Sequence, residues 1–442
     1  MFRLAFKILR STALVQAVAV PKRPCEILTF APPLFRFRYL FSVTPGSTRG
    51  PAQQRRTSGT PDQVRGDEGG KSELGFSNYA VTRLRQDLGF GSQLGIVRAM
   101  PAVRLLPPHR FFDRSEWSAI TRPSRWRGVW LVAHAWIVSI ALVGVAAWSG
   151  NPAAWLVAVV FVGGRQLGLA ILMHDGAHGA LHPNRKINNF LGQWLTGAAV
   201  GSDLIAYRTY HLRHHKYTQQ PEDPDLSLSK PFPTSRASLA RKIMRDLTGQ
   251  TFFKQRMAQF GLALRGLKAM LRGEKAERGG ASTRAGTPFN KQSADGMTSP
   301  DDDTAGAMAV TRAVGRFLTV QAVLLGVSLA LYGWTPYLLW LAGLATSFQL
   351  YLRVRNIAEH ACTTTGSDDP FTHARTTHAG WLARATVAPY WVNYHAEHHL
   401  FMAVPCYRLP QVHVALGRAG KHEAMTIAPD YRSVMRQVTA PG

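Results

Sequence analysis

The chain has 442 residues, enough for roughly two or three soluble domains or for one membrane domain with extensions. It carries 52 lysines and arginines against 26 acids, a formal net charge of +26 that excludes a typical acidic cytosolic enzyme. Nucleic acid, an anionic membrane face and an acidic protein remain as partners for this charge. The three cysteines, Cys25, Cys362 and Cys406, form no CxxC pair, which argues against a disulfide framework, a zinc ribbon and a cysteine-ligated iron–sulfur site.

The first part of the chain, residues 1–99, differs in composition from the rest. It begins with a basic, amphipathic stretch without an acid before Glu26, which is typical of a mitochondrial transit peptide. Residues 44–75 are rich in Gly, Ser, Pro and Arg and are expected to be disordered. An equally good interpretation is an over-called start, with translation beginning at Met100. We therefore treat residues 1–99 as a leader and expect one membrane domain over 100–435.

Four apolar stretches predict transmembrane helices in two hairpins. About 20 apolar residues span a bilayer, and residues 128–148 contain no Asp, Glu, Lys or Arg. The other predicted spans are 153–173, 317–334 and 336–352, and a short uncharged turn joins the members of each pair. Arginines flank the opposite ends of the spans, so the positive-inside rule places both turns outside and the rest in the cytosol. The predicted fold is an all-α integral membrane protein with four transmembrane helices and a cytosolic helical cap.

A long insert, residues 226–312, separates the two predicted hairpins. Residues 238–272 alternate Arg and Lys with Leu, Met and Phe at helical spacing, which predicts basic amphipathic helices on the membrane surface or against the cytosolic domain. Residues 273–307 have low complexity and are predicted to be a flexible linker. The semi-apolar stretch 187–206 contains Asp203 and is predicted to be a short interfacial or re-entrant helix.

Histidines are concentrated in three clusters that predict a metal site. His174 and His178 are four positions apart and share one helix face at the end of the second predicted span. In the other two clusters, with the pattern HxxHH, the first histidine shares a face with both others; they are His211, His214, His215 and His395, His398, His399. Imidazole suits iron, zinc, copper and nickel, and these eight histidines are too many for one tetrahedral ion. The pattern therefore predicts a cap that binds two metal ions.

Further residues complete the predicted site. His360 is expected to be a ninth ligand, and Asn356, one helical turn earlier, to hold a metal-bound water. Four acids are expected to accept the second N–H of the liganding histidines, namely Asp175, Asp203, Glu359 and Glu397. For the acids of residues 220–225, the sequence does not distinguish between this role and a structural one. No ligand role is assigned to His109, His134, His182, His373, His378, His413 and His422.

The motifs HDGAH (174–178), HLRHH (211–215) and HAEHH (395–399) resemble the three histidine boxes of the membrane fatty acid desaturase family. The resemblance covers about residues 105–435. It implies two non-haem irons, which use dioxygen and external electrons to remove two hydrogens from an alkyl chain and leave a cis alkene. The spacing of Asn356 and His360 also resembles the extra ligand pair of the acyl-CoA desaturase branch.

Two features depart from common members of that family. Met402 stands where many desaturases have a proline after His-His-Leu-Phe, which bears on the subfamily and not on the reaction class. No His-Pro-Gly-Gly haem signature is present, so the resemblance implies a separate electron donor. A basic cytosolic face suits an acidic ferredoxin or a cytochrome b5-like protein.

The leading function is thus an O2-dependent desaturase that acts on an acyl chain of a fatty acid or lipid. A hydroxylase or ketolase of the same superfamily, acting on a lipid or carotenoid, would keep the same ligands. A histidine-rich metal transporter would place ligands along a path through the membrane, whereas only His134 lies at mid-span here. The charge comes with no nucleic-acid recognition motif, so no nucleic-acid partner is expected.

The expected location is a multi-pass membrane protein with its active site on the cytosolic side. An over-called start favours the bacterial inner membrane, whereas a true transit peptide favours an organelle. The sequence leaves the acyl-chain length, the double-bond position, the acyl carrier and the oligomeric state undetermined.

Overall fold

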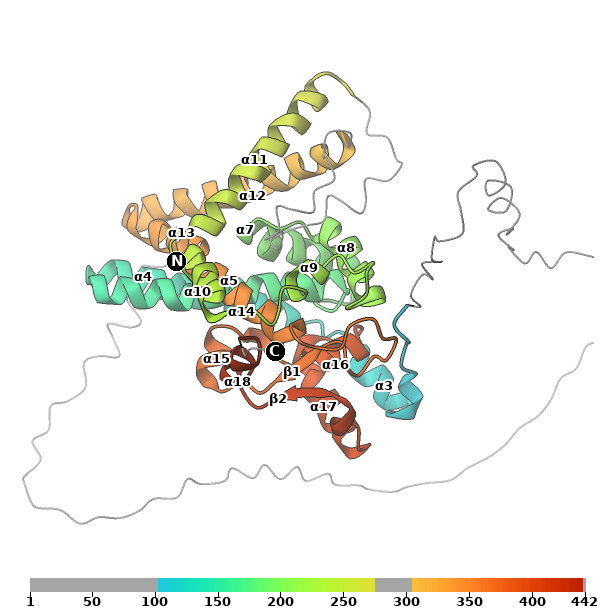
Figure 1. Cartoon of the computed structure of the whole chain (residues 1–442). Helices are drawn as coiled ribbons and strands as arrows, with labels where there is room; N and C mark the ends of the chain where they lie inside the picture. Colours follow the sequence, from blue (N-terminus) through green and yellow to red (C-terminus); the bar gives the residue numbers. More distant parts are fainter. Residues whose placement is uncertain (1–101, 275–303, 440–442) are drawn as a thin grey trace, which may run out of the picture. The chain divides into compact units, whose positions relative to one another are not determined.

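The computed structural model describes residues 102–274 and 304–439 (Figure 1). These residues all belong to one of the chain's two units, Leu94–Gly442. The predicted leader and residues 275–303 of the predicted linker lie outside the described residues. The described part is mostly helical, as expected, with a small sheet of two parallel strands.

In chain order, the helices and strands are the 3-10 helix η1 (Pro108–Arg110), α3 (Arg114–Thr121), α4 (Arg127–Ser149), α5 (Pro152–Ala177), α6 (Arg185–Phe190), the π-helix η2 (Leu191–Gly197), α7 (Ala198–Val200), α8 (Leu204–Tyr217), α9 (Leu226–Ser229), α10 (Arg236–Leu247), α11 (Gln250–Leu271), α12 (Thr304–Tyr332), α13 (Thr335–Ala345), α14 (Ser347–His360), β1 (Arg375–Thr377), α15 (Trp381–Ala385), the 3-10 helix η6 (Pro389–Trp391), α16 (His395–Leu400), the 3-10 helix η7 (Cys406–Arg408), α17 (Leu409–Arg418), the 3-10 helix η8 (His422–Ala424), β2 (Thr426–Ala428) and α18 (Tyr431–Gln437).

Three described helices are long and apolar enough to cross a membrane: α4, α5 and residues Gly306–Tyr332 of α12. The turn between α4 and α5 has local causes. Gly150 ends α4 with a φ of +60°, which glycine adopts without strain. Asn151 then caps α5 by accepting the Ala153 N–H at 2.9 Å. The structure therefore agrees with the first predicted hairpin, and α5 continues past the predicted end of its span to Ala177.

The fourth predicted span, 336–352, is not one continuous helix. α13 ends at Ala345, and Thr346 breaks the helix with φ −122° and ψ −83° before α14 begins. The 11 residues of α13 rise about 16 Å, whereas a bilayer core is about 30 Å thick. Ser347 donates its hydroxyl to the Val159 carbonyl of α5 at 2.5 Å, which ties the break to a neighbouring helix. Hydropathy alone did not reveal this break because both halves are apolar.

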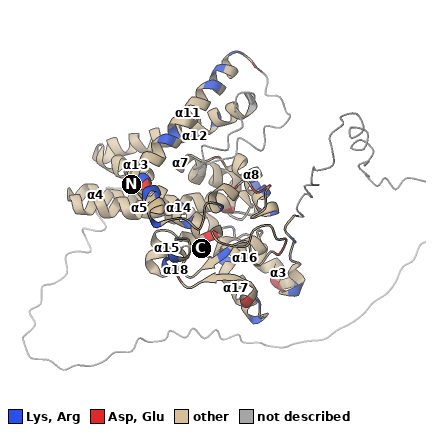
Figure 2. Ribbon diagram, in the orientation of Figure 1, with Lys and Arg blue, Asp and Glu red and all other residues tan. Residues whose placement is uncertain are grey.

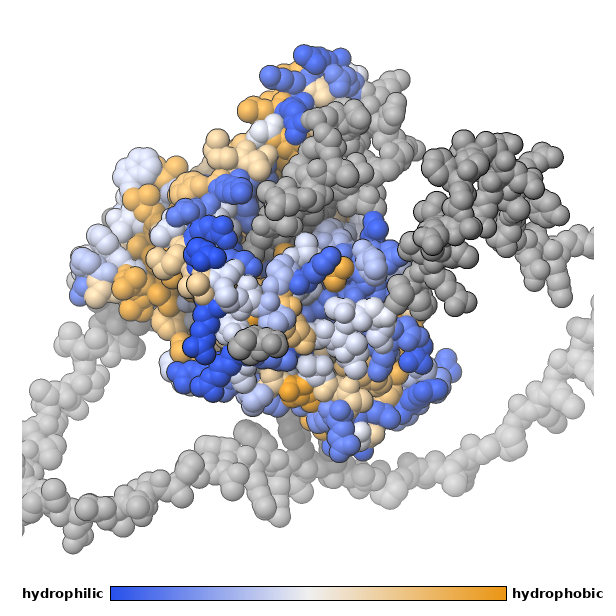
Figure 3. All heavy atoms as spheres, in the orientation of Figure 1, coloured by the Kyte–Doolittle hydropathy of each residue, from blue (hydrophilic) through white to orange (hydrophobic). Residues whose placement is uncertain are grey.

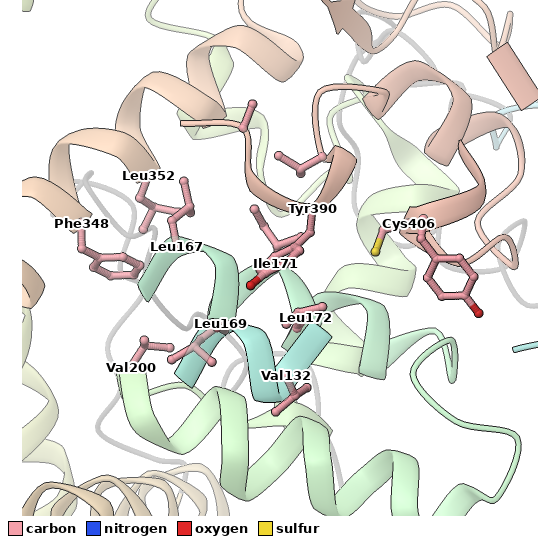
Figure 4. Packing of buried hydrophobic residues seen from close by; sticks show 14 of the residues in the cluster. Val132, Leu167, Leu169, Ile171, Leu172, Val200, Phe348, Leu352, Tyr390 and Cys406 are labelled. Carbon is pink, nitrogen blue, oxygen red and sulfur yellow. The ribbon is translucent and has the colours of Figure 1, made fainter. Parts of the chain in front are cut away.

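α5 is the central helix, and it packs against α4, α13, α14 and η2. Two of its glycines permit this close packing. A Cβ at Gly163 would lie 2.1 Å from the Ser347 hydroxyl, and one at Gly168 would lie 2.5 Å from the Tyr390 ring. Figure 4 displays the surrounding apolar core, which includes Val132, Leu167, Leu169, Ile171, Leu172, Val200, Phe348, Leu352 and Tyr390.

The described part of the insert forms helices where amphipathic helices were predicted. α11 packs along α12, and the Thr311 hydroxyl donates to the Ala263 carbonyl at 2.8 Å. Because α12 starts at Thr304, the last residues of the predicted linker are helical. The predicted interfacial stretch 187–206 consists of the short elements α6, η2 and α7 followed by the start of α8. Figure 3 shows hydrophobic surface over α4, α12 and α13, on the side of the view away from α8 and α17.

A buried ion pair joins the insert to the helix that carries His360. Arg353 of α14 donates to Asp246 of α10 through two nitrogens, one at 2.8 Å, and the two residues are 5% and 0% exposed. Replacing Asp246 by Ala leaves a buried guanidinium without its carboxylate. We expect the free energy of unfolding to fall by about 3–5 kcal/mol, measured by thermal unfolding of the full chain in detergent.

The matched control is Asp368→Ala, which removes the partner of Arg104 in an exposed pair 3.0 Å apart. Exposed pairs contribute about 0–1 kcal/mol, so this variant should unfold almost as the parent does. Equal losses in the two variants would contradict the importance assigned to the buried pair.

Candidate metal centre

The structure brings all nine predicted histidine ligands together from α5 and its C-cap, α8, α14 and α16. They form two groups, and in each group one ring nitrogen per histidine lies within 4.8 Å of the others. The first group comprises His174, His178, His211, His215 and His398, and the second comprises His214, His360, His395 and His399. The structure shows that the nine histidines lie close together, whereas their role as metal ligands stays a prediction.

Helix geometry explains why each HxxHH cluster contributes to both groups. Side chains four positions apart lie on one face, whereas neighbours in sequence point about 100° apart. On α8, His211 and His215 accordingly belong to the first group and His214 to the second. On α16 the assignment is reversed, since His398 alone joins the first group.

Ring nitrogens converge at the centre of the first group. The Nε2 of His215 lies 2.9 Å from the Nε2 of His211 and 3.0 Å from the Nε2 of His398. A neutral imidazole nitrogen carries either one proton or one lone pair, so three such atoms cannot all satisfy one another. The Nε2 atoms of His174 and His178 are buried and find no hydrogen-bond partner among the described residues. Converging lone pairs with orphaned nitrogens are a donor set that fits a metal cation.

The second group has the same arrangement. The Nε2 of His395 lies 2.9 Å from that of His360 and 3.1 Å from that of His399. The His214 ring lies edge-on to both His360 and His399, with ring centroids 4.8 and 5.0 Å away. Four imidazoles match the ligand number of one ion with nitrogen ligands.

Oxygen atoms fix the orientation of several rings from outside. The Nδ1 of His214 lies 2.8 Å from the Asp223 carboxylate, and the Nδ1 of His360 lies 3.0 Å from the carbonyl of His373. A carboxylate or carbonyl only accepts, so each Nδ1 carries a proton, and in the neutral form of the ring the lone pair is then on Nε2. This is the tautomer that a metal bound at Nε2 requires.

His399 is oriented by a hydroxyl in the same way. Its Nδ1 lies 3.2 Å from the Thr218 hydroxyl oxygen. That hydroxyl donates its own hydrogen to the His214 carbonyl at 2.8 Å. Thr218 therefore accepts from His399, and the His399 Nε2 is left free to face the group.

Comparison with known proteins identifies the family. Residues 151–429, well over half of the chain, match the family described as fatty acid desaturase. The chain belongs to the fatty acid desaturase family. The resemblance inferred from the histidine motifs is thus confirmed, and the matched region contains all nine histidines.

A curated relative is the dihydrorhizobitoxine desaturase of Bradyrhizobium elkanii. It is 24% identical over 259 residues, which cover 58% of this chain and 66% of that protein. The chain thus aligns with just under two thirds of the length of this relative. Both comparisons support an oxidoreductase of the desaturase type, and the apolar helices mark it as a membrane protein.

The four acids predicted to orient histidines of this desaturase-family protein take different places. Glu359 lies 3.3 Å from the Nδ1 of His395, on another helix. Asp175 lies 3.8 Å from the Nδ1 of His174, too far for a hydrogen bond, and accepts the Cys406 N–H instead.

The remaining two acids contact no histidine of either group among their described partners. Asp203 caps α8 and pairs with Arg316. Glu397 accepts from the Thr376 hydroxyl and pairs with His413. Glu397 precedes His398 directly, and adjacent helical side chains point about 100° apart. Closeness in sequence is therefore a poor guide to which carboxylate meets which imidazole.

Three oxygen partners were not assigned from the sequence: Asp223, Thr218 and the carbonyl of His373. Asp223 lies in residues 220–225, for which the sequence allowed either a structural role or contact with a histidine. In the structure its carboxylate accepts a hydrogen bond from the Nδ1 of His214. Its other oxygen accepts the Gln219 N–H at 2.8 Å, which turns the loop back onto the end of α8. The sequence feature that could have predicted the contact with His214 is the Pro-rich acidic turn directly after the histidine cluster of residues 211–215. A backbone carbonyl such as that of His373 has no sequence signature.

Burial sets the protonation of the histidines. It lowers the pKa of His178 and of His360 to about 3, so both rings are neutral at pH 7. Burial also acts on His214, but the carboxylates of Asp223 and Asp225 outweigh it and raise its pKa. Neutral imidazole is the form that binds a metal.

A small cavity adjoins the second group. Its volume is about 30 Å³, and its lining includes Tyr207, Arg355, Asn356 and the rings of His360 and His395. This is room for about two waters. The predicted water held by Asn356 has space at this place, and that role remains a prediction.

Thr218 provides a test of the orienting contacts. Thr218→Val keeps the shape of the side chain but removes the acceptor of the His399 N–H. Loss of such a contact typically costs about 10–100-fold in metal affinity, measured as metal retained by the purified full chain against a graded chelator. The matched control is Thr311→Val, which removes hydroxyl bonds to the Ala263 and Ala307 carbonyls on α11 and α12, helices that carry none of the nine histidines. A Thr218 variant that retains metal as well as this control does would contradict the assignment.

Acid should destabilise the metal-free protein. Histidines of the unfolded chain titrate near 6.5, whereas His178 and His360 have folded pKa values of about 3. Below about pH 6.5 the unfolded state binds more protons, so the free energy of unfolding falls as the pH falls toward 3. His214 acts in the opposite sense. Its pKa is raised to about 9, so it contributes stability below about pH 6.5 that is lost as the pH rises through about 9.

Thermal unfolding of the metal-free full chain in detergent measures this dependence, at about pH 7.5, 6 and 5. We expect the unfolding temperature to drop along this series. The double variant His178→Gln and His360→Gln should show a shallower drop. An unfolding temperature that stays constant over the series would contradict the neutral, buried state of these rings.

Proposed function

We propose that this protein is a membrane-bound, di-iron, O2-dependent desaturase that introduces a cis double bond into an acyl chain of a fatty acid or lipid. The observation that carries the proposal is the convergence of nine imidazoles, six of them buried and three partly buried, in two groups at the end of an apolar helical hairpin. Bound iron would supply the redox chemistry that breaks an unactivated C–H bond, which protein side chains cannot do alone. The name of the curated relative favours desaturation over hydroxylation or ketone formation.

The protein's own residues supply the surroundings of that chemistry. The five histidines of the first group would hold one iron, and the four histidines of the second group, which include His360, would hold the other. Asp223, Glu359 and Thr218 hold three of the rings in place through their Nδ1 atoms. The apolar side chains of α5 exclude water from the end of the helix that carries His174. These apolar side chains would pack favourably against an acyl chain that enters from the lipid phase.

The electron donor is proposed to be an acidic ferredoxin or a cytochrome b5-like protein. α8 carries the middle histidine cluster, and its Arg213 and Lys216 are exposed. Figure 2 shows the Lys and Arg residues of the described part in blue, some of them on α8. Positive charge near a redox site favours encounter with an acidic partner. We further propose that this side faces the cytosol and that the membrane is the bacterial inner membrane. Nothing in this proposal involves a nucleic acid.

The lipid profile of a host that expresses the full chain tests this function, by gas chromatography–mass spectrometry with double-bond derivatisation. The control is His398→Ala, which removes one member of the first group. We expect a new unsaturated acyl species with the parent chain, reduced at least about 100-fold in the variant because a metal ligand is lost. Co-expression with a ferredoxin supplies electrons.

The products separate the alternatives. A hydroxylated or keto lipid would identify the hydroxylase or ketolase instead. Full turnover and full iron content in the His398 variant would exclude that residue as a ligand. Cellular metal uptake that depends on the same histidines, without a lipid product, would favour the transporter.

A further inference from the structure

A groove separate from the metal centre opens beside the start of α4. Its volume is about 710 Å³, and its walls come from α3, the segment that joins α3 to α4, the loop after α5 and η7. The lining includes the arginines Arg122, Arg125 and Arg408 and the hydroxyls of Ser118 and Ser124, and no acidic residue belongs to it. The groove is therefore a cationic, hydroxyl-rich site on the described surface.

Two of its three guanidinium groups are available to a ligand. Arg122 and Arg125 are exposed, and neither forms an ion pair or a side-chain hydrogen bond with the described residues. Arg408 is committed to the protein: its Nη1 donates to the carbonyls of Ala119 and Arg122, the latter at 2.7 Å. Arg408 thus fixes the wall of the groove, whereas the other two arginines have no such commitment among the described residues.

Tyr407 holds the segment between α3 and α4 in place. Its hydroxyl accepts the Ser124 N–H at 2.8 Å, and its ring lies beneath the guanidinium groups of Arg127 and Arg408, at 5.4 and 5.6 Å. The backbone that carries Arg122 and Arg125 is therefore anchored at both sides of Ser124. A backbone that is already fixed does not have to be ordered when its arginines bind an anion, which lowers the entropy cost of binding.

The groove lies beside the start of a candidate membrane span. α4 is a candidate span that starts at Arg127, two residues after Arg125. Trp126 and Trp130 are 78% and 60% exposed at this end of the helix. Exposed tryptophans at the end of a span are typical of the head-group region of a bilayer. Lipid phosphates occupy the same region.

The groove also lies at the histidine end of the α4–α5 hairpin. A Cβ at Gly128 would lie 2.0 Å from the Leu181 carbonyl oxygen, so the start of α4 packs directly on the segment that follows His178. The Cys406 N–H at the start of η7 donates to Asp175 at 2.9 Å, beside His174. A short, hydrogen-bonded stretch thus connects the groove wall to the metal centre.

We propose that this groove binds the phosphate of the head group that carries the acyl chain, with Arg122 and Arg125 as its charged contacts. The proposal rests on the proposed function, because it names the substrate class of the same site. The planar fork of arginine matches phosphate oxygens, and hydroxyls add further donors. Two carriers share this chemistry, a membrane phospholipid and the acyl thioester of coenzyme A, whereas a free fatty acid or a carotenoid lacks a phosphate.

Equilibrium binding tests the proposal on the iron-loaded full chain in maltoside micelles, which contain no phosphate. The probes are stearoyl-coenzyme A, phosphatidylglycerol and stearate. The test variant is Arg122→Gln with Arg125→Gln. The matched control is Arg110→Gln with Arg114→Gln, which removes the same charge from two exposed arginines just outside the groove.

We expect the test variant to bind at least one phosphate-bearing probe about tenfold or more weakly, since charged hydrogen bonds are lost. The control should stay close to the parent, and stearate should bind all three proteins alike. Loss for stearoyl-coenzyme A alone identifies a soluble acyl carrier, and loss for phosphatidylglycerol alone identifies a phospholipid. Loss for both supports recognition of the phosphate itself.

The proposal is overturned if the test variant and the control bind both phosphate-bearing probes equally, or if stearate binding falls as much as theirs. Binding is read without turnover, so the two proposals fail separately. Loss of probe binding in the test variant, with no unsaturated product from the parent, would support the groove and count against the desaturase function.

Discussion

The protonation of nine closely packed imidazoles is the constraint on which the rest of the site depends. Each ring must present a lone pair inward, where Nε2 atoms approach within about 3 Å of one another. Its N–H must then point outward and meet an oxygen, because an unpaired buried donor is costly. Asp223, Thr218 and the His373 carbonyl meet this need for three rings. The loops that carry these oxygens are therefore as much a part of the centre as the histidine motifs.

α5 connects this polar centre to the apolar part of the molecule. Its glycines allow α14 and the Tyr390 segment to approach its backbone, and its last turns carry His174 to the first histidine group. The same helix is thus lined by hydrocarbon along most of its length and by imidazoles at its end. In the proposed function, that arrangement would bring an acyl chain and a redox metal to one place. The arginine groove beside α4 lies at the same end and gives a polar head group a place to bind.

Local patterns predicted much of this structure. Continuous apolar runs predicted α4, α5 and the spanning part of α12, because a bilayer sets the required length. Histidine spacing predicted which rings share a helix face, and all nine predicted residues gather in the two groups. The interpretation was weaker for the fourth span, where Thr346 divides an apolar run. It was also weaker for the acids: of the four proposed, Glu359 alone comes within hydrogen-bonding distance of a histidine of the two groups among the described residues.

The sequence by itself thus determined the family, through motifs that resemble its histidine boxes. It also determined the helical class and the histidines that gather in the two groups, since these follow from composition and from periodicity within single helices. Only the tertiary structure decided which histidines pair across helices, which oxygens orient them, and how the arginines that precede α4 meet Arg408 in one groove. These are contacts between segments far apart in the chain. They depend on how helices pack and turn relative to one another, and no local spacing encodes that geometry.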